Sequence, residues 1–261
     1  APKTMNQAIV APIKEFLSRK TAIAILVFII IYKLADAFAL ALNTPFLLRG
    51  VGFDLATVGA VAKSVGVSAT LIGSLIGGIL MPSLGLYRSL MIFGFLQIAS
   101  NLAYALLALV GKSFIAMVAA VFTEYFCGGL STVAFIVFLT ALCDRRFTAT
   151  QYALFSAAMA VGRVFVGPEA AAMVDHMGWF LFYLSTFIIG IPSLILLWWL
   201  KSKLDFSAYK LIRYQIEDNT VQLTNAIVHY HHCNTLPVTA RCDHVHASWL
   251  FLVESARRVR S

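Results

Sequence analysis

Residues 21–48 read TAIAILVFIIIYKLADAFALALNTPFLL, a stretch dominated by aliphatic and aromatic side chains. A helix needs about 20 mostly apolar residues to cross about 30 Å of hydrocarbon, so this stretch predicts a membrane-spanning helix. Similar stretches follow, separated by short breaks with glycine, proline or charged residues: 55–81, 87–110, 113–143, 149–174 and 179–200. The sequence therefore predicts an all-α integral membrane protein whose spans form a six-helix bundle.

The composition favours the same class. Of 261 residues, 60% are hydrophobic and 12% are charged, and the mean hydropathy is +0.85. A soluble domain usually has about twice that share of charge, which argues against a soluble or a disordered chain. We expect three regions: a cytoplasmic amphipathic helix or linker over residues 1–20, the six-span bundle over 21–201, and a polar cytoplasmic tail over 202–261.

The lysines and arginines near the span ends predict the orientation. If the N-terminus is inside, only Arg49 and Lys112 lie outside. The inside group then has eleven members: Lys3, Lys14, Arg19, Lys20, Arg88, Arg145, Arg146, Lys201, Lys203, Lys210 and Arg213. Because cytoplasmic loops of membrane proteins are enriched in Lys and Arg, we expect both termini to be cytoplasmic. This pattern also accounts for the net charge of +8 without a nucleic-acid partner.

The first predicted span contains charged residues within its apolar sequence. Lys33 and Asp36 are three residues apart and can pair across one helical turn, and Asn43 falls on the same stripe. Charged groups are costly in hydrocarbon and tend to face a bundle interior or a water-filled path. We interpret the stripe as the lining of a cavity in which Asp36 exchanges a proton. The alternative is a buried ion pair that only holds helices in register.

The third and fourth spans contain further polar residues. Gln97, Ser100, Asn101 and Tyr104 have the spacing of one helix face, and their groups can bind sugar hydroxyls and peptides. The alternative is hydrogen bonding between helices, which is common for such residues in membranes. Glu124 is a lone carboxylate in a very apolar stretch, which suits proton exchange. Its alternative is an interface residue near the membrane surface.

Two other basic residues lie inside predicted spans. Arg163 in the fifth span presents five donors in a fixed geometry that suits a carboxylate or phosphate, although it could instead pair with Glu169 or Glu124. Lys63 lies deep in the second span, where tight helix packing through the glycines does not account for a charge. Residues 21–200 contain no nucleophile–base arrangement, nucleotide-binding loop or catalytic metal motif, so we expect no enzyme activity and no cofactor.

Several motifs resemble one family. The segment YKLADAFAL at 32–40, followed by NTPFL at 43–47, resembles the seventh span of AmpG-type muropeptide permeases. These permeases are major-facilitator transporters of the bacterial inner membrane. The segment ALCDRRFTATQYA at 141–153 resembles the loop between their tenth and eleventh spans, and GRVFVGP at 162–168 resembles their eleventh. The resemblance covers about residues 6–203, and beyond that we find none.

The resemblance implies the C-terminal half of a major-facilitator transporter, because members of the family have twelve or more spans and bind substrate between two six-span halves. It implies proton-driven import of anhydro-muropeptides, the disaccharide-peptide fragments released in peptidoglycan turnover. The partners are then the substrate, protons, the lipid bilayer and a separately encoded first half. The expected proton-coupling residues are Asp36 and Glu124, and the expected substrate-binding residues are Lys33, Asn43, Gln97, Asn101, Tyr104 and Arg163.

A second hypothesis for the function is based on the polar tail. It contains a group of possible metal ligands, namely His231, His232, Cys233, Cys242, His244 and His246. Histidine and cysteine at close spacing can bind zinc, but this pattern matches no standard ligand spacing. A disordered tail or translation in a different reading frame are the alternatives. The competing function is a non-transporting membrane scaffold or a sensor that uses this tail.

Overall fold

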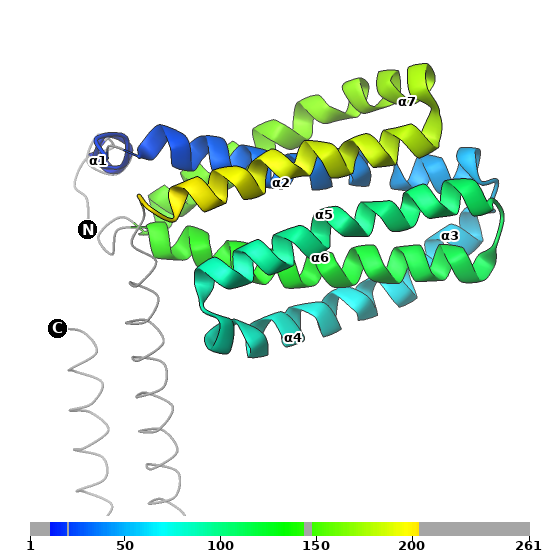
Figure 1. Ribbon diagram of the computed structural model, residues 1–261, viewed down its shortest axis with the longest axis horizontal. Coiled ribbons are helices and arrows are strands. Elements are labelled where there is room, and N and C mark those ends of the chain that lie inside the picture. The colour runs from blue at the N-terminus through cyan, green and yellow to red at the C-terminus, as the bar shows by residue number, and fades with distance from the viewer. Residues whose placement is uncertain (1–10, 20, 144–147, 204–261) are drawn as a thin grey trace, which may run out of the picture. The chain divides into compact units, whose positions relative to one another are not determined.

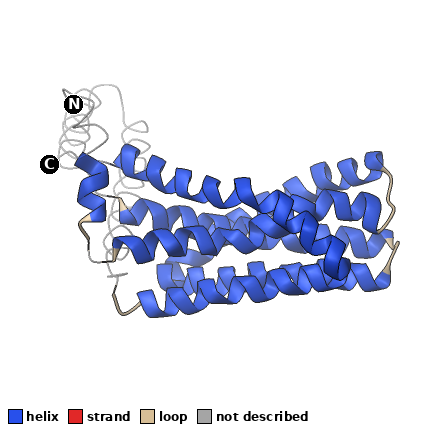
Figure 2. Cartoon of the chain, turned by 90° about the horizontal axis from the view of Figure 1, so that it is seen from above, coloured by secondary structure: helices blue, strands red, loops and turns tan. Residues whose placement is uncertain are grey.

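A computed structural model describes residues 11–19, 21–143 and 148–203, and these lie within one compact unit. The described part is helical throughout, with short loops and no strand (Figure 2). A short helix, α1 (Ala11–Leu17), precedes the long ones. The others are α2 (Ala22–Pro45) with its π-helical extension η2 (Phe46–Gly50), α3 (Leu55–Val61), η3 (Ala62–Gly66), α4 (Val67–Leu84), α5 (Leu86–Val110), α6 (Phe114–Leu142) and α7 (Thr148–Leu200).

Five helical segments of the described residues are long and apolar enough to cross a membrane: 22–50, 55–84, 86–110, 114–142 and 166–200. The sequence predicts six spans. The last two expected stretches, 149–174 and 179–200, both fall in α7, which contains a non-helical residue at Gly178 with φ of 78° and ψ of 170°. Figure 1 shows the yellow-green and yellow parts of α7 as two arms that run in opposite directions.

Local sequence explains several helix boundaries. Asp54 caps the start of α3, because its carboxylate accepts a hydrogen bond from the backbone N–H of Ala56 at 2.9 Å. Ser113 caps α6 in the same way through the N–H of Ala116. Between α4 and α5 the chain turns at Gly85 alone, with φ of 80°, a conformation that a residue with a Cβ rarely adopts. These signals place tight turns between long helices.

The helices pack mainly in four pairs, which are α2 with α7, α4 with α6, α5 with α6, and α5 with α7. Glycines allow the closest approach between α4 and α6. A Cβ on Gly73 would collide with the backbone carbonyl oxygen of Phe126. A Cβ on Gly129 would lie 2.5 Å from the backbone carbonyl oxygen of Thr70. The expected role of the glycines in tight packing is therefore confirmed for this pair of helices.

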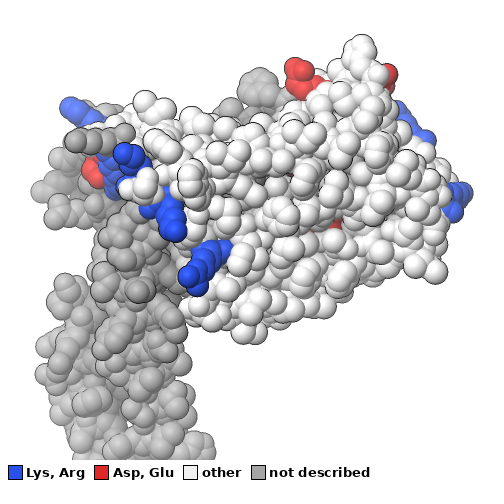
Figure 3. Space-filling model, viewed as in Figure 1, with Lys and Arg blue, Asp and Glu red and all other residues white. Residues whose placement is uncertain are grey.

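Contacts between distant segments show which helix ends lie together. One end of the bundle contains two such contacts, Arg19 with the carbonyl of Leu142 and Lys201 with the ring of Tyr87. The other end contains Phe46 packed on Trp179 and Lys112 over the ring of Phe53. On the face shown in Figure 3, Lys and Arg side chains lie toward the two ends, and the broad zone between them is almost entirely uncharged. This is the distribution that a membrane-spanning bundle requires.

The short helix α1 is attached to the start of α7. The ring of Phe16 is fully buried and contacts the ring of Phe155 edge-on, with centroids 4.9 Å apart. Glu15 pairs with Arg19 at 3.0 Å and accepts a hydrogen bond from the amide of Gln151 at 2.6 Å. The segment before the first span is thus docked on the bundle through residues 15–19.

Candidate functional site

The first polar feature inside the bundle is an ion pair within α2. The ammonium of Lys33 lies 3.0 Å from Oδ2 of Asp36, as the spacing predicts. The Lys33 ammonium also lies 5.9 Å from the ring centre of Tyr32 and 5.7 Å from that of Phe135, within cation–π range. Asp36 is 6% exposed, and its other oxygen has no hydrogen-bond partner among the described residues. The Lys33 charge is therefore compensated, whereas the Asp36 carboxylate retains one free acceptor.

The second feature is a buried carboxylate on α6. Glu124 is 2% exposed, and both of its oxygens contact side chains of α5. The amide of Gln97 donates to Oε1 at 3.2 Å, and the hydroxyl of Ser100 lies 2.6 Å from Oε2. The predicted polar face of the third span is therefore buried against the fourth.

The hydroxyl of Ser100 has two acceptors within reach but only one hydrogen. It lies 2.6 Å from Oε2 of Glu124 and 2.6 Å from the backbone oxygen of Gln97. If Glu124 is ionised, Ser100 donates to it. If Glu124 is protonated, Ser100 donates to the Gln97 carbonyl while the Glu124 carboxyl donates to Ser100. The same arrangement of atoms thus accommodates both protonation states of this carboxyl group.

Among the described residues, no hydrogen bond or ion pair joins the α2 ion pair to the α5–α6 contact, but the charges lie near enough to interact. The charges of Asp36 and Lys33 on α2 act on Glu124 on α6. We call Lys33, Asp36, Gln97, Ser100 and Glu124 the polar cluster. Three helices contribute to it, so its geometry depends on how α2, α5 and α6 pack rather than on any single helix.

A second polar contact joins α7 to α2. The hydroxyl of Tyr183 on α7 donates to Oδ1 of Asn43 at 3.0 Å, and the rings of Tyr183 and Tyr104 stack with centroids 5.2 Å apart. The amide nitrogen of Asn43 and both amide atoms of Asn101 are buried without a hydrogen-bond partner in the described part of the chain. Buried polar atoms are normally satisfied, so these are candidate contacts for water or a ligand.

The structure places half of the eight predicted coupling and substrate-binding residues in the polar cluster and leaves some of the other predicted residues undescribed. Lys33 and Asp36 form one contact of the polar cluster, and Gln97 and Glu124 form another. Arg163 lies in α7, but its side chain is outside the described part, as are the tail ligand candidates His231, His232, Cys233, Cys242, His244 and His246. Within the described residues, no group of three or more His, Cys, Asp or Glu side chains could hold a metal ion.

Sequence reasoning missed two tyrosines with buried hydroxyl groups. Besides Tyr183, the hydroxyl of Tyr32 lies 3.2 Å from that of Ser131 on α6 and donates to the carbonyl of Leu90 at 3.3 Å. The signal that could have identified Tyr32 is its position next to Lys33 in a span that is otherwise apolar. Tyr183 stands directly between Phe182 and Leu184 in sequence, and only the packing of α7 on α2 places it against Asn43.

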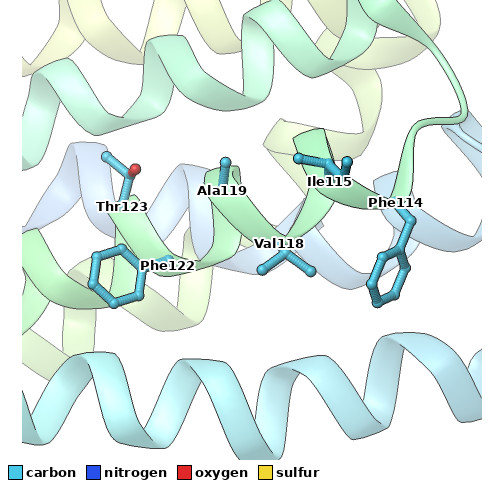
Figure 4. Close-up of a pocket in the computed structure, with 6 residues that line it drawn as sticks. All are labelled: Phe114, Ile115, Val118, Ala119, Phe122 and Thr123. Atoms are coloured by element: carbon cyan, nitrogen blue, oxygen red, sulfur yellow. The ribbon is translucent and has the colours of Figure 1, made fainter.

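A groove of about 400 Å³ lies along the first half of α6 (Figure 4). The residues that line it are Phe114, Ile115, Val118, Ala119, Phe122 and Thr123, of which only threonine is polar. Such a lining offers almost no hydrogen-bonding group to a sugar or a peptide. The polar cluster is therefore the better candidate for a functional site.

The apolar helices and the buried charges between them define an all-helical, multi-pass membrane protein. The chain is similar to the anhydromuropeptide permease of Escherichia coli (strain K12), with 48% identity over 223 residues that cover 85% of this chain and 44% of that protein. It is also similar to the putative transporter AmpG 4 of Rickettsia conorii (strain ATCC VR-613 / Malish 7), with 34% identity over 76% of this chain and 47% of that protein. No family model matches the chain.

These relatives confirm the resemblance to AmpG-type permeases that the motifs indicate, and their names are those of transporters, not enzymes. The chain spans about half the length of the curated relatives that it matches.

The expectation that the resemblance ends at about residue 203 is wrong. The match to the Escherichia coli protein covers 223 residues, more than the stretch up to Lys203 contains, so this match extends into the tail. The polar composition of the tail made this similarity hard to recognise by motif.

Proposed function

We propose that this chain forms the second half of a proton-coupled importer of anhydro-muropeptides in the bacterial inner membrane. The main support is the 48% identity to a relative named anhydromuropeptide permease. The buried polar cluster adds chemical support, since a carboxyl group that can hold or release a proton lies beside polar groups inside an apolar bundle. Intramembrane ionisable residues of this kind commonly mark proton or substrate pathways.

In this proposal the segment 21–201 crosses the membrane six times, and both of its ends lie on the cytoplasmic side. The two arms of α7, residues 148–177 and 179–200, meet at Gly178. At 1.5 Å per residue, each arm is long enough to cross about 30 Å of hydrocarbon. An even number of spans is also what the positions of the Lys and Arg residues favour.

The proposed roles follow the chemistry of each group. Glu124 exchanges the coupling proton with help from Ser100, and Asp36 is the second proton-exchanging group, held by Lys33. The substrate-binding groups are amides, hydroxyls and cations that suit sugar and peptide groups, namely Lys33, Asn43, Gln97, Asn101, Tyr104 and Arg163. The buried amide atoms of Asn43 and Asn101 that have no described partner fit this role.

Transport in this proposal requires a further six-span half, either separately encoded or part of a longer polypeptide. Major-facilitator transporters bind substrate between two halves and move them in alternation. The chain matches only 44% of the Escherichia coli permease, which is compatible with one half.

Uptake of labelled anhydro-muropeptide into proteoliposomes tests the proposal. We expect no uptake by this chain alone, and gradient-driven uptake when it is combined with the part of the Escherichia coli permease that it does not match. A protonophore is the control, because it should abolish accumulation without removing the protein. Uptake by the chain alone would contradict the half-transporter model, and the lack of uptake by the combined halves would contradict a transport function.

A further inference from the structure

Lys63 is the one cation of the second span. It does not belong to the polar cluster, and it is not one of the residues in close contact between helices. It is the ninth residue of the segment Leu55–Leu84, which is long and apolar enough to span a membrane, and its side chain is exposed. Neither of the ion pairs found among the described residues, Arg19–Glu15 and Lys33–Asp36, includes it. An exposed charge at this depth is costly against lipid tails, so it needs water or a counter-ion.

The backbone around Lys63 departs from a regular helix. Residues Ala62–Gly66 form η3, a π-helical turn between α3 and α4, and such turns within helices frequently occur at functional sites. Ser64 and Ser68 are also exposed on this segment. Their hydroxyls donate to backbone oxygens of their own helix at 2.7 Å, so they add polarity to this face without needing further partners.

The last residue of η3, Gly66, is buried and packs against α6 next to the polar cluster. A Cβ on Gly66 would lie 3.4 Å from the ring of Tyr125, the residue that follows Glu124. Lys63 is three residues from Gly66, or about 4.5 Å along a helix. Lys63 therefore lies at nearly the same depth in the membrane as the buried carboxyl group of Glu124, but on the exposed side of its own helix.

We propose that the ammonium of Lys63 faces the water-filled substrate path and binds a carboxylate of the peptide part of the transported muropeptide. This inference rests on the proposed function. Lys33 is already paired with Asp36, whereas Arg49 and Arg88 lie within three residues of the ends of their spanning segments. Among the described residues, Lys63 is therefore the cation away from the span ends that has no ion pair. An ammonium group offers three donors to a carboxylate, and the flanking serines keep that face polar.

Thiol labelling tests whether this face is in contact with water. The four native cysteines are changed to serine, and Lys63→Cys is then treated with a membrane-impermeant anionic thiol reagent. The matched control is Ile188→Cys, because Ile188 is 57% exposed and is the tenth residue after the break at Gly178, on the α7 arm that starts at the same end of the bundle. We expect rapid labelling at position 63 that muropeptide slows, and little labelling at position 188. Equal, slow labelling at both positions would contradict the proposal, since it would place Lys63 against lipid with its ammonium extended to the interface.

Uptake kinetics test the binding of the carboxylate. In the combined halves, Lys63→Gln should raise KM for the muropeptide about tenfold or more with little change in maximal rate, which is the effect of losing a charge-assisted hydrogen bond. Lys63→Arg should retain most of the affinity, and Lys112→Gln, which removes a cation at the end of the bundle, should have no effect.

A substrate with amidated peptide carboxylates distinguishes the possible outcomes. We expect Lys63→Gln to leave KM for this neutral analogue unchanged. If the variant weakens the transport of both compounds equally, Lys63 pairs with a protein side chain and the inference is wrong. If the unmodified halves transport neither compound, the proposed function itself fails.

Discussion

At the scale of single residues, the chemistry of the bundle depends on how each buried charge is compensated. Lys33 and Asp36 neutralise one another within one turn of α2, whereas Glu124 is surrounded by neutral donors from α5. Hydrogen bonds from Gln97 and Ser100 stabilise a carboxylate without cancelling its charge. Glu124 can therefore gain or lose a proton without breaking an ion pair.

The first prediction concerns Glu124. Glu124→Gln preserves size and hydrogen-bonding capacity but removes titration, so the protein should reach the membrane at a normal level. In the combined halves, gradient-driven uptake should be abolished while exchange of labelled for unlabelled substrate continues. Glu169→Gln, at an exposed glutamate of α7, is the control and should retain driven uptake. Normal driven uptake by Glu124→Gln would place the coupling proton elsewhere.

The second prediction concerns the ion pair. Asp36→Asn leaves the Lys33 ammonium without its counter-ion, which should destabilise the protein by roughly 3 kcal/mol and lower its thermal midpoint in detergent. Combining Asp36→Asn with Lys33→Gln should restore most of the stability, because no unpaired charge remains. Driven uptake then separates two roles. The double variant should stay inactive if Asp36 exchanges protons, and full recovery would show that Asp36 is only a counter-ion.

At the scale of helices, close backbone contact and side-chain docking hold the elements in register. The α4–α6 contact has no room for a side chain at Gly73 or Gly129, whereas no atom lies within 4 Å of a Cβ built on Gly78. Because Gly78 is on the same helix as Gly73, it offers a matched comparison of packing at similar helix propensity.

The third prediction follows from this contrast. Gly129→Ala should destabilise the bundle by about 1–3 kcal/mol through overpacking against α4, and Gly73→Ala should act in the same direction. Gly78→Ala should be neutral or slightly stabilising, since alanine favours the helix and meets nothing. Thermal unfolding in detergent provides the comparison. Equal midpoints for all three variants would show that α4 and α6 are not in this close contact.

The fourth prediction concerns the docking of α1. The Phe16 ring is fully buried against Phe155, whereas the neighbouring Leu17 is 51% exposed. Phe16→Ala should release α1 and increase hydrogen exchange of its backbone amides, because Phe16 is the one buried side chain among those described in this helix. Leu17→Ala should leave exchange nearly unchanged. The docking would be refuted by equal exchange rates in the two variants.

At the scale of the whole molecule, tertiary contacts agree with the distribution of basic residues. Arg19 and Lys201 contact residues at one end of the bundle, and Lys112 lies at the other with Phe53. Arg19 and Lys201 both belong to the larger of the two predicted groups of basic residues, and they lie at the end where α1 docks. This is the end that we expect in the cytoplasm.

The fifth prediction is therefore a topology. Reporter domains fused before Thr21 and after Lys203 should both report a cytoplasmic location, and a reporter inserted in the loop at Lys112 should report the opposite side. The loop fusion serves as the internal control for reporter activity. A periplasmic signal from either of the first two fusions would rule out six spans with this orientation.

The sequence by itself determined the features that depend on neighbours within one helix. Apolar length predicted the spanning helices, and the spacing of Lys33 and Asp36 predicted their ion pair, which is 3.0 Å long. Helical periodicity likewise placed Gln97 and Ser100 on one face. These inferences succeed because hydrophobic transfer and helix geometry are local properties of the chain.

Only the tertiary structure decided which faces meet. Glu124 contacts Ser100 across two helices, and Asn43 accepts a hydrogen bond from Tyr183, which is 140 residues away in sequence. The rotation and register of each helix determine such contacts, and these depend on steric fit at sites such as Gly73 and Gly129. Periodicity shows that a helix face is polar, but helix packing determines which side chains of the neighbouring helices form hydrogen bonds with that face.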